Sequence, residues 1–198
     1  MIKVILFDVD GVLISGKRFS EKFSKDYKID KVSLVKFFEG PFQESLIGNA
    51  DLKELLVPNL KTWGWEKTVD EFLKYWFEEE IEIDTELISY IKDLRKKGFV
   101  VCLATNQEKY RFKYFLEELG FADFFDKTFA SAHLGHIKED VRFFEKLMQD
   151  LKKFKKEEIL FWDDSIINID TAREFGINAE VYIDFSDFKR KISKYDLE

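Results

Sequence analysis

Residues 1–16 read MIKVILFDVDGVLISG, and this stretch decides the fold. Five of the residues from 2 to 7 are apolar, as in a buried strand. The run ends in Asp8 and Asp10, with one residue between them. Burying one unpaired carboxylate is costly, and a second one beside it adds repulsion. A strand that ends in this way indicates a functional site whose ligands offset that cost.

Further apolar runs predict more strands of the same sheet, at 99–104 (FVVCLA), 158–162 (EILFW), 180–183 (EVYI) and, more weakly, 127–130 (KTFA). Amphipathic helical patterns lie between these runs, at 83–98, 110–120, 139–151 and 165–176. Strands that alternate with helices are typical of a parallel sheet covered on both sides. We therefore predict an α/β fold with a Rossmann-like parallel sheet and helices on both faces.

The segment after the first strand departs from this alternation. Residues 16–82 contain helical patterns but no convincing strand. A connection of about 67 residues is far longer than an ordinary crossover loop. We expect an inserted, mostly helical subdomain that begins near Ser15 and Gly16 and ends near residues 82–84.

The composition limits the possible partners. The chain has 198 residues and a net charge of −7, which argues against general binding to nucleic acid or to an anionic membrane. No apolar run approaches the ~18 residues of a membrane span, and the N-terminus lacks the pattern of a secretory signal. The lone cysteine, Cys102, suits a reducing compartment. We expect a cytoplasmic protein without nucleic-acid or membrane partners, and the sequence leaves its oligomeric state open.

Polar side chains follow four of the predicted strands. They are Asp8 and Asp10, Thr105 and Asn106, Lys138, and Asp163 and Asp164. Each has an ordinary alternative. Two aspartates separated by one residue are common, Thr105 and the pair Asp163 and Asp164 could cap helices, and Lys138 could be a surface lysine. In open parallel sheets, however, ligands bind outside the carboxyl ends of the strands. Because all four groups come to that one edge, a shared site is the better interpretation.

The chemistry of this set is specific. Carboxylates without histidine or cysteine partners suit a hard cation, and Mg²⁺ is the plainest choice. Thr105 and Lys138 can donate hydrogen bonds to a phosphoryl group, whose transfer needs mostly positioning and charge neutralisation. An aspartate can itself accept the phosphoryl group. The cation and the phosphate would then offset the cost of gathering the acids.

Four motifs in order make the chain similar to the haloacid dehalogenase-like hydrolase superfamily. They are FDVDGV (7–12), LATN (103–106), GHIKED (135–140) and FWDDSIINIDTA (161–172). The resemblance covers nearly the whole chain and implies a catalytic core of residues 1–14 and 84–198. It also implies a helical cap, residues 15–83, of the type that follows the first motif. One departure is Glu139, because proline often follows the lysine of the third motif.

The resemblance implies a catalytic role for four residues. Asp8 would attack phosphorus, and Asp10 would protonate the leaving oxygen and later deprotonate water. Thr105 would bind the phosphate, and Lys138 would neutralise both Asp8 and the phosphate. An acid at position 10 is typical of the phosphatases and phosphomutases of this superfamily.

The resemblance also implies the ligands of the metal and the phosphate. Asp8 and Asp164 would ligate Mg²⁺ together with the backbone carbonyl of Asp10, and Asp163 would help directly or through water. The backbone of Asn106 would join Thr105 and Lys138 around the phosphate.

The function predicted from these residues is that of a Mg²⁺-dependent phosphatase with an aspartyl-phosphate intermediate. Its substrate would be a small phosphorylated metabolite such as a sugar phosphate or phosphoglycolate. Two alternatives stay open at this stage. One is a phosphosugar mutase built on the same core, and the other is a phospho-acceptor or binding protein without turnover.

Overall fold

The centre of the molecule is a parallel sheet of five strands. The computed structural model describes residues 1–16, 19–78, 81–195 and 197. The strand order is β5-β4-β1-β6-β7, and every neighbouring pair in this sheet is parallel. The bounds are β1 (Val4–Phe7), β4 (Val100–Thr105), β5 (Lys127–Ala130), β6 (Ile159–Asp163) and β7 (Asn178–Val181). The chain runs from β1 outward to β5 and then crosses back to β6, so β1 lies at the point where the direction of winding reverses.

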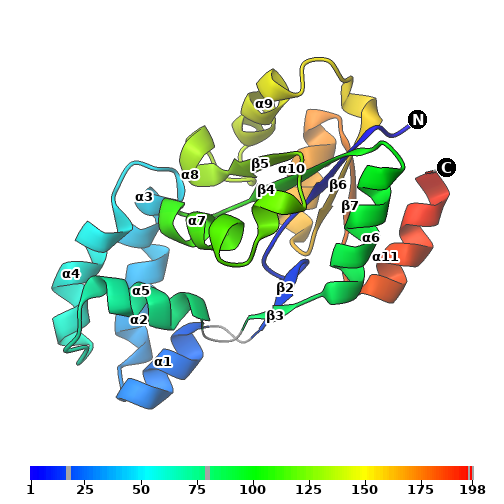
Figure 1. The fold of residues 1–198 in the computed structure, drawn as a ribbon. Helices are drawn as coiled ribbons and strands as arrows, with labels where there is room; N and C mark the ends of the chain where they lie inside the picture. Colours follow the sequence, from blue (N-terminus) through cyan, green and yellow to red (C-terminus); the bar gives the residue numbers. More distant parts are fainter. Residues whose placement is uncertain (17–18, 79–80, 196, 198) are drawn as a thin grey trace.

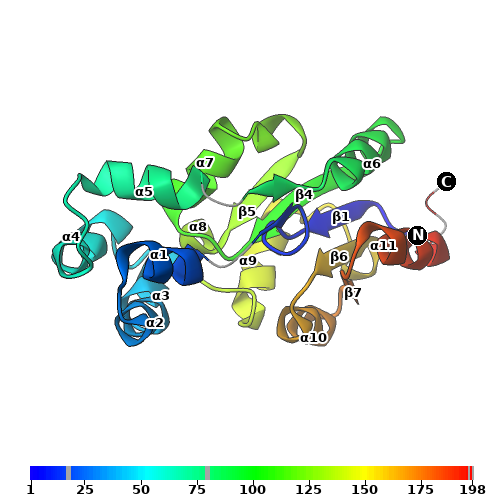
Figure 2. The same cartoon turned by 90° about the horizontal axis from the view of Figure 1, so that it is seen from below.

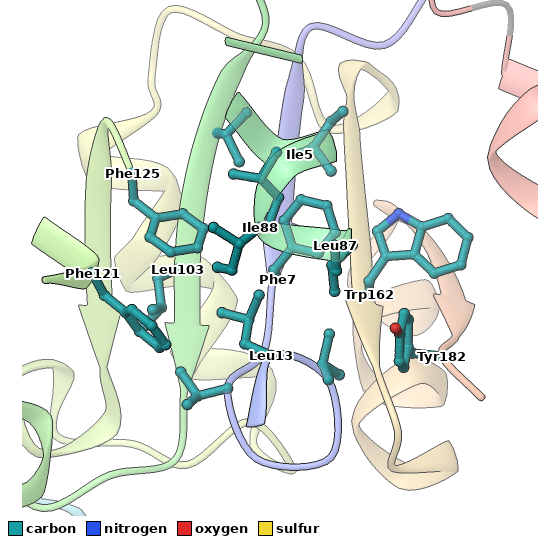
Figure 3. Close-up of a cluster of buried hydrophobic side chains, with 14 of the residues drawn as sticks. Ile5, Phe7, Leu13, Leu87, Ile88, Leu103, Phe121, Phe125, Trp162 and Tyr182 are labelled. Carbon is teal, nitrogen blue, oxygen red and sulfur yellow. The ribbon is translucent and has the colours of Figure 1, made fainter. Parts of the chain in front are cut away.

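Side chains alternate between the two faces of each central strand, as the pleat requires. On β1, Ile5 and Phe7 belong to one buried apolar cluster, whereas Val4 and Leu6 belong to the other. Figure 3 shows the first cluster, with Phe7 from β1 next to side chains of β4, β6 and a flanking helix, α6 (Thr85–Lys96). Apolar residues on both faces explain why these strands read as continuous apolar runs rather than as alternating ones.

Helices cover both faces of the sheet. On one face lie α6 (Thr85–Lys96), α7 (Lys109–Glu117) and α11 (Phe185–Ile192). On the other lie α9 (Val141–Asp150) and α10 (Ile166–Phe175), as Figure 2 shows. A short helix, α8 (Ser131–Leu134), follows β5 directly, and the 3₁₀ turns are η1 (Phe121–Asp123), η2 (Lys156–Glu158) and η3 (Ser193–Tyr195). The predicted Rossmann-like α/β fold is confirmed.

In the described parts of the chain, residues 8–16, 19–78 and 81–99, five helices of the segment between β1 and β4 form a group of their own, apart from α6. They are α1 (Phe19–Tyr27), α2 (Lys31–Glu39), α3 (Pro41–Leu46), α4 (Leu52–Thr62) and α5 (Val69–Glu78). We call them the helical bundle. It has an apolar core of its own, rich in aromatic rings such as Phe23, Trp63 and Phe72. Figure 1 shows the bundle at one end of the molecule, beyond α7 and α8.

A short antiparallel ribbon ties the two ends of the bundle to the sheet. It is made of β2 (Ile14–Ser15) and β3 (Glu82–Ile83), with Ile14 opposite Ile83 and Ser15 opposite Glu82. The chain therefore leaves the core and returns to it at neighbouring positions.

The structure differs from the sequence-based expectations in a few elements. The last strand starts at Asn178, two residues earlier than predicted, because the side-chain amide of this polar residue donates to the carbonyl of Ile159 on β6 at 3.0 Å. The helices α1, α3, α8 and α11 and the short strands β2 and β3 were not predicted. Among the residues that the structure describes, no helix combines the length and the apolar character that crossing a bilayer requires.

Candidate active site

The carboxyl ends of three adjacent strands bring the predicted acidic and phosphate-binding residues together. Asp8 follows β1 directly, Thr105 ends β4 and Asp163 ends β6. All three are almost inaccessible to solvent, with exposed fractions of 5%, 1% and 0%. Side chains of this polarity are rarely buried without partners, so their contacts show what the site is built to hold.

Lys138 is the cation at the centre of this group. It reaches the sheet from the loop after α8, and only 1% of it is exposed. Its Nζ lies 2.7 Å from Asp8 Oδ1 and donates a hydrogen bond of 2.6 Å to Asp163 Oδ2. Burial by itself lowers the pKa of Lys138, but the charges of Asp8 and Asp163 outweigh burial and hold the pKa above its ordinary value. The lysine therefore stays charged between the two carboxylates.

Asp163 holds Lys138 in place and is itself fixed by the start of α10. Its Oδ1 accepts from the backbone N–H of Ser165 at 2.8 Å, and its two oxygens accept from Asn168 Nδ2 at 3.0 and 3.1 Å. Because Lys138 also donates to Asp163, most of the positions at which the Asp163 carboxylate can accept a hydrogen bond are already used. Asp163 is thus chiefly a group that orients the lysine, and it offers less to an incoming cation than its neighbours do.

Asp8 is the acid that this arrangement leaves short of positive charge. One lysine faces two buried carboxyl groups, so the cluster would have one negative charge too many if both were ionised. Burial raises the pKa of Asp8 to about 8, with Lys138 opposing the shift and Asp163 adding to it. An electrostatic field of this kind favours the arrival of a further cation.

The carboxylates have the geometry of a site for a divalent ion. Asp8, Asp163 and Asp164 each present an oxygen such that the three oxygens lie within 4.8 Å of one another. Asp164 lies over Gly11, where a Cβ atom would come 2.2 Å from Asp164 Oδ2. Burial and the charge of Asp163 raise the pKa of Asp164. An oxygen-only donor set with excess negative charge fits Mg²⁺.

Asn106 links the second and third motifs through its side chain. Its Oδ1 accepts from the backbone N–H of Lys138 at 2.8 Å, and its Nδ2 donates to Glu139 Oε2 at 2.9 Å. Glu139, the residue that departs from the superfamily pattern, therefore orients the amide of Asn106.

The carboxylate of Asp10 is separate from the acidic cluster. Arg111 donates to both of its oxygens, from Nη2 to Oδ1 at 2.8 Å and from Nη1 to Oδ2 at 2.9 Å. The side-chain amide of Gln107 also donates to Oδ2. The sequence analysis did not identify Arg111, and it gave no role to Gln107, which follows Asn106 after the second strand. Their position in the sequence could have indicated a role. Gln107 lies in the loop after Thr105 and Arg111 in the first turn of α7, at the edge of the sheet where the other site residues lie.

A cavity of about 820 Å³ joins these groups to the helical bundle. Its floor includes Asp8, Thr105 and Lys138, and Asp10 and Arg111 lie on its wall. The bundle contributes aromatic and polar side chains, namely Phe19, Phe38, Glu39, Gln43 and Trp76. A ligand in this cavity would touch both the sheet edge and the bundle.

A family model for haloacid dehalogenase-like hydrolases matches residues 2–176. The chain belongs to the haloacid dehalogenase-like hydrolases. The match includes all four motifs and the helical bundle, so the bundle lies inside the family's span rather than beyond it.

One curated relative and several solved structures match this hydrolase over nearly their whole length. A D-ribitol-5-phosphate phosphatase of Bacteroides thetaiotaomicron is 28% identical over 90% of this chain and 91% of its own. A predicted hydrolase of the same family from Porphyromonas gingivalis has a TM-score of 0.83 at 25% identity, with 98% of both chains covered. A family enzyme of B. thetaiotaomicron, solved as a magnesium complex, has a TM-score of 0.79 at 25% identity, covering 96% of this chain and 98% of that one. The same enzyme was also solved with magnesium and inorganic phosphate.

Proposed function

We propose that this hydrolase is a Mg²⁺-dependent phosphatase of small phosphorylated metabolites, with Asp8 as the residue that becomes phosphorylated. The observation that carries the proposal is the buried Asp8 carboxylate, held by Lys138 at 2.7 Å on the floor of an open cavity. A carboxylate positioned by a cation and facing a ligand cavity is suited to nucleophilic attack.

The metal ligands in this proposal are Asp8, Asp164 and the backbone carbonyl of Asp10, with Asp163 acting directly or through water. The 4.8 Å grouping of the three carboxylates and their uncompensated charge support this assignment. Mg²⁺ at this point would neutralise the charge of the phosphate and of Asp8.

The remaining steps fall to side chains and backbone of the chain itself. Thr105, the backbone of Asn106 and Lys138 bind the phosphate oxygens while Asp8 attacks phosphorus. Asp10 gives a proton to the oxygen of the leaving group as the phosphorus–oxygen bond breaks. In the second half of the reaction Asp10 takes a proton from water, which attacks phosphorus and releases Asp8.

The helical bundle and its tethers, residues 15–83, act as a cap over the site in this proposal. Its wall of the cavity combines aromatic rings with Glu39 and Gln43, a mixture that suits a hydroxyl-rich organic group. The name of the B. thetaiotaomicron relative supports the same class of substrate, a sugar or polyol phosphate. The enzyme would work in the cytoplasm, where such metabolites occur.

The test is phosphate release from a panel of sugar, polyol and organic-acid phosphates. We expect turnover with Mg²⁺ and none after removal of the metal by EDTA. Asp8→Asn should lower kcat by at least about 10³-fold, since the nucleophile is lost. Turnover that survives in this variant, or in EDTA, would contradict the proposal. Isomerised product without net phosphate release would identify a mutase instead.

A further inference from the structure

The acids of the site are divided between two cations. Lys138 pairs with Asp8 and Asp163 at 2.7 and 2.6 Å, whereas Arg111 pairs with Asp10 alone. Arg111 lies in the first turn of α7, and its guanidinium donates to both Asp10 oxygens at 2.8 and 2.9 Å. A two-point contact of this kind fixes the plane of a carboxylate as well as its position.

Arg111 is itself held firmly. Its backbone N–H donates to the buried carboxylate of Glu108 at 2.5 Å, which caps α7. Its guanidinium lies 4.9 Å from the centre of the Phe115 ring, and its side chain is 21% exposed. The arginine is therefore a preorganised part of the wall rather than a mobile surface side chain.

Asp10 is the more accessible partner. Its side chain is 44% exposed, and both Asp10 and Arg111 line the cavity. The amide of Gln107 supports the carboxylate from the same loop as the phosphate-binding Thr105 and Asn106. The donors approach Asp10 from α7 and from the loop before it, and they leave it facing the cavity.

We propose that Arg111 is a positioning residue that acts on the substrate through Asp10, and this proposal rests on the proposed function above. Arg111 fixes the Asp10 carboxyl group where the leaving oxygen departs. In the structure both Asp10 oxygens accept hydrogen bonds, as in a carboxylate, so Asp10 first takes up a proton from solvent. When the phosphorus–oxygen bond breaks, that proton passes to the leaving oxygen, and Arg111 holds the carboxylate that remains. Later a water molecule attacks the phosphorylated Asp8 and gives a proton to Asp10. Both residues are then ready for the next turnover.

Two classes of substrate separate this role from a structural one. An aryl phosphate such as 4-nitrophenyl phosphate has a leaving group that departs with little help from a proton. An alkyl ester such as D-ribitol 5-phosphate or glycerol 3-phosphate needs the proton. The parameter kcat/KM covers only the steps up to formation of the phosphorylated enzyme, so it isolates the half-reaction in which Asp10 is the acid.

The experiment measures kcat/KM of the full chain with Mg²⁺ on both classes. Arg111→Met should lower the value for the alkyl esters by about 10²-fold, the usual contribution of a placed acid. The value for the aryl ester should stay within about threefold. Arg111→Lys keeps the charge without the two-point contact and should recover only part of the loss. Lys113→Met, on the same helix with a 67% exposed side chain, is the matched control and should behave as the wild type.

A double-mutant cycle shows whether Arg111 acts through Asp10. Asp10→Asn should show the same selective loss, and adding Arg111→Met to it should cost little more, since the group being positioned is already gone. Equal losses on aryl and alkyl esters, or additive losses in the double variant, would overturn the proposal. If Arg111→Met fails to fold in a thermal melt, the same criteria apply to Arg111→Lys. A wild type that hydrolyses neither class refutes the proposed phosphatase function instead.

Discussion

Gly11 shows how closely backbone and carboxylate fit at the site. Its φ is +78°, and the position of its missing Cβ is filled by the side chain of Asp164. An alanine here meets two separate penalties. The first is the left-handed backbone conformation, and the second is the displacement of Asp164 from the acidic cluster. These penalties can be measured separately.

We expect Gly11→Ala to lose about 1–2 kcal/mol of stability from the backbone term and to bind Mg²⁺ more weakly as well. Gly120→Ala is the matched control, because Gly120 has φ +70° but no atom near the new Cβ. It should lose comparable stability and keep its Mg²⁺ affinity. Chemical denaturation measures the first effect, and titration of Mg²⁺ against thermal unfolding measures the second. Unchanged Mg²⁺ affinity in Gly11→Ala would contradict the inferred contact.

The strands explain which site residues the sequence could reveal. Asp8, Thr105 and Asp163 stand at the ends of buried strands, and parallel pairing brings such positions to one edge whatever the details of the helices. Their side-chain roles stay predictions. Arg111 could not be found in this way, because its position depends on the rotation of α7 about its axis. In the sequence it stands between Tyr110 and Phe112 as one more polar residue of an amphipathic helix.

Helix α7 also joins the core to the helical bundle. Asp51 caps α4 through the backbone N–H of Lys53, and it accepts from Tyr110 Oη at 2.8 Å and from Lys109 Nζ at 2.7 Å. Burial by itself raises the pKa of Asp51, but the hydrogen bonds from Lys109, Tyr110 and the backbone of Lys53 outweigh it and lower the pKa to about 2. Asp51 is therefore charged at neutral pH and ties α4 to α7.

We expect Tyr110→Phe to cost about 1.5–3 kcal/mol of unfolding free energy, the usual range for a hydrogen bond to a charged group. The ring and its packing remain in this variant, so the hydroxyl alone is tested. Tyr90→Phe serves as control, since the Tyr90 hydroxyl has no protein partner in the part of the chain that the structure describes, and it should be close to neutral. Equal effects of the two substitutions in urea denaturation would show that the contact between α4 and α7 contributes nothing.

Three separate apolar clusters stabilise the molecule, one on each face of the sheet and one inside the helical bundle. Of the four tryptophans in the chain, Trp63, Trp65 and Trp76 lie in the bundle cluster, whereas Trp162 belongs to strand β6 and packs in the cluster on one face of the sheet. Tryptophan fluorescence therefore reports mostly on the bundle, whereas far-UV circular dichroism reports on the entire chain.

Phe72→Ala should leave a cavity among the bundle's aromatic rings and cost about 3–5 kcal/mol there. Phe72 is fully buried and contacts the rings of Phe23 and Trp65. In a Trp162→Phe background, we expect fluorescence to change at lower urea concentration than circular dichroism, because the bundle loosens before the sheet. Coincident transitions would mean that the bundle and the sheet unfold as one unit.

The β2–β3 ribbon makes the helical bundle an insertion between two paired strands. Since Ser15 and Glu82 face each other across a single antiparallel ladder, the bundle occupies the place of a hairpin turn. Closing that hairpin with two residues such as Asn-Gly would excise the bundle without breaking the order of the parallel strands. The same junction would accept a different insert, so we expect that the helical bundle can be exchanged while the parallel sheet keeps its strand order.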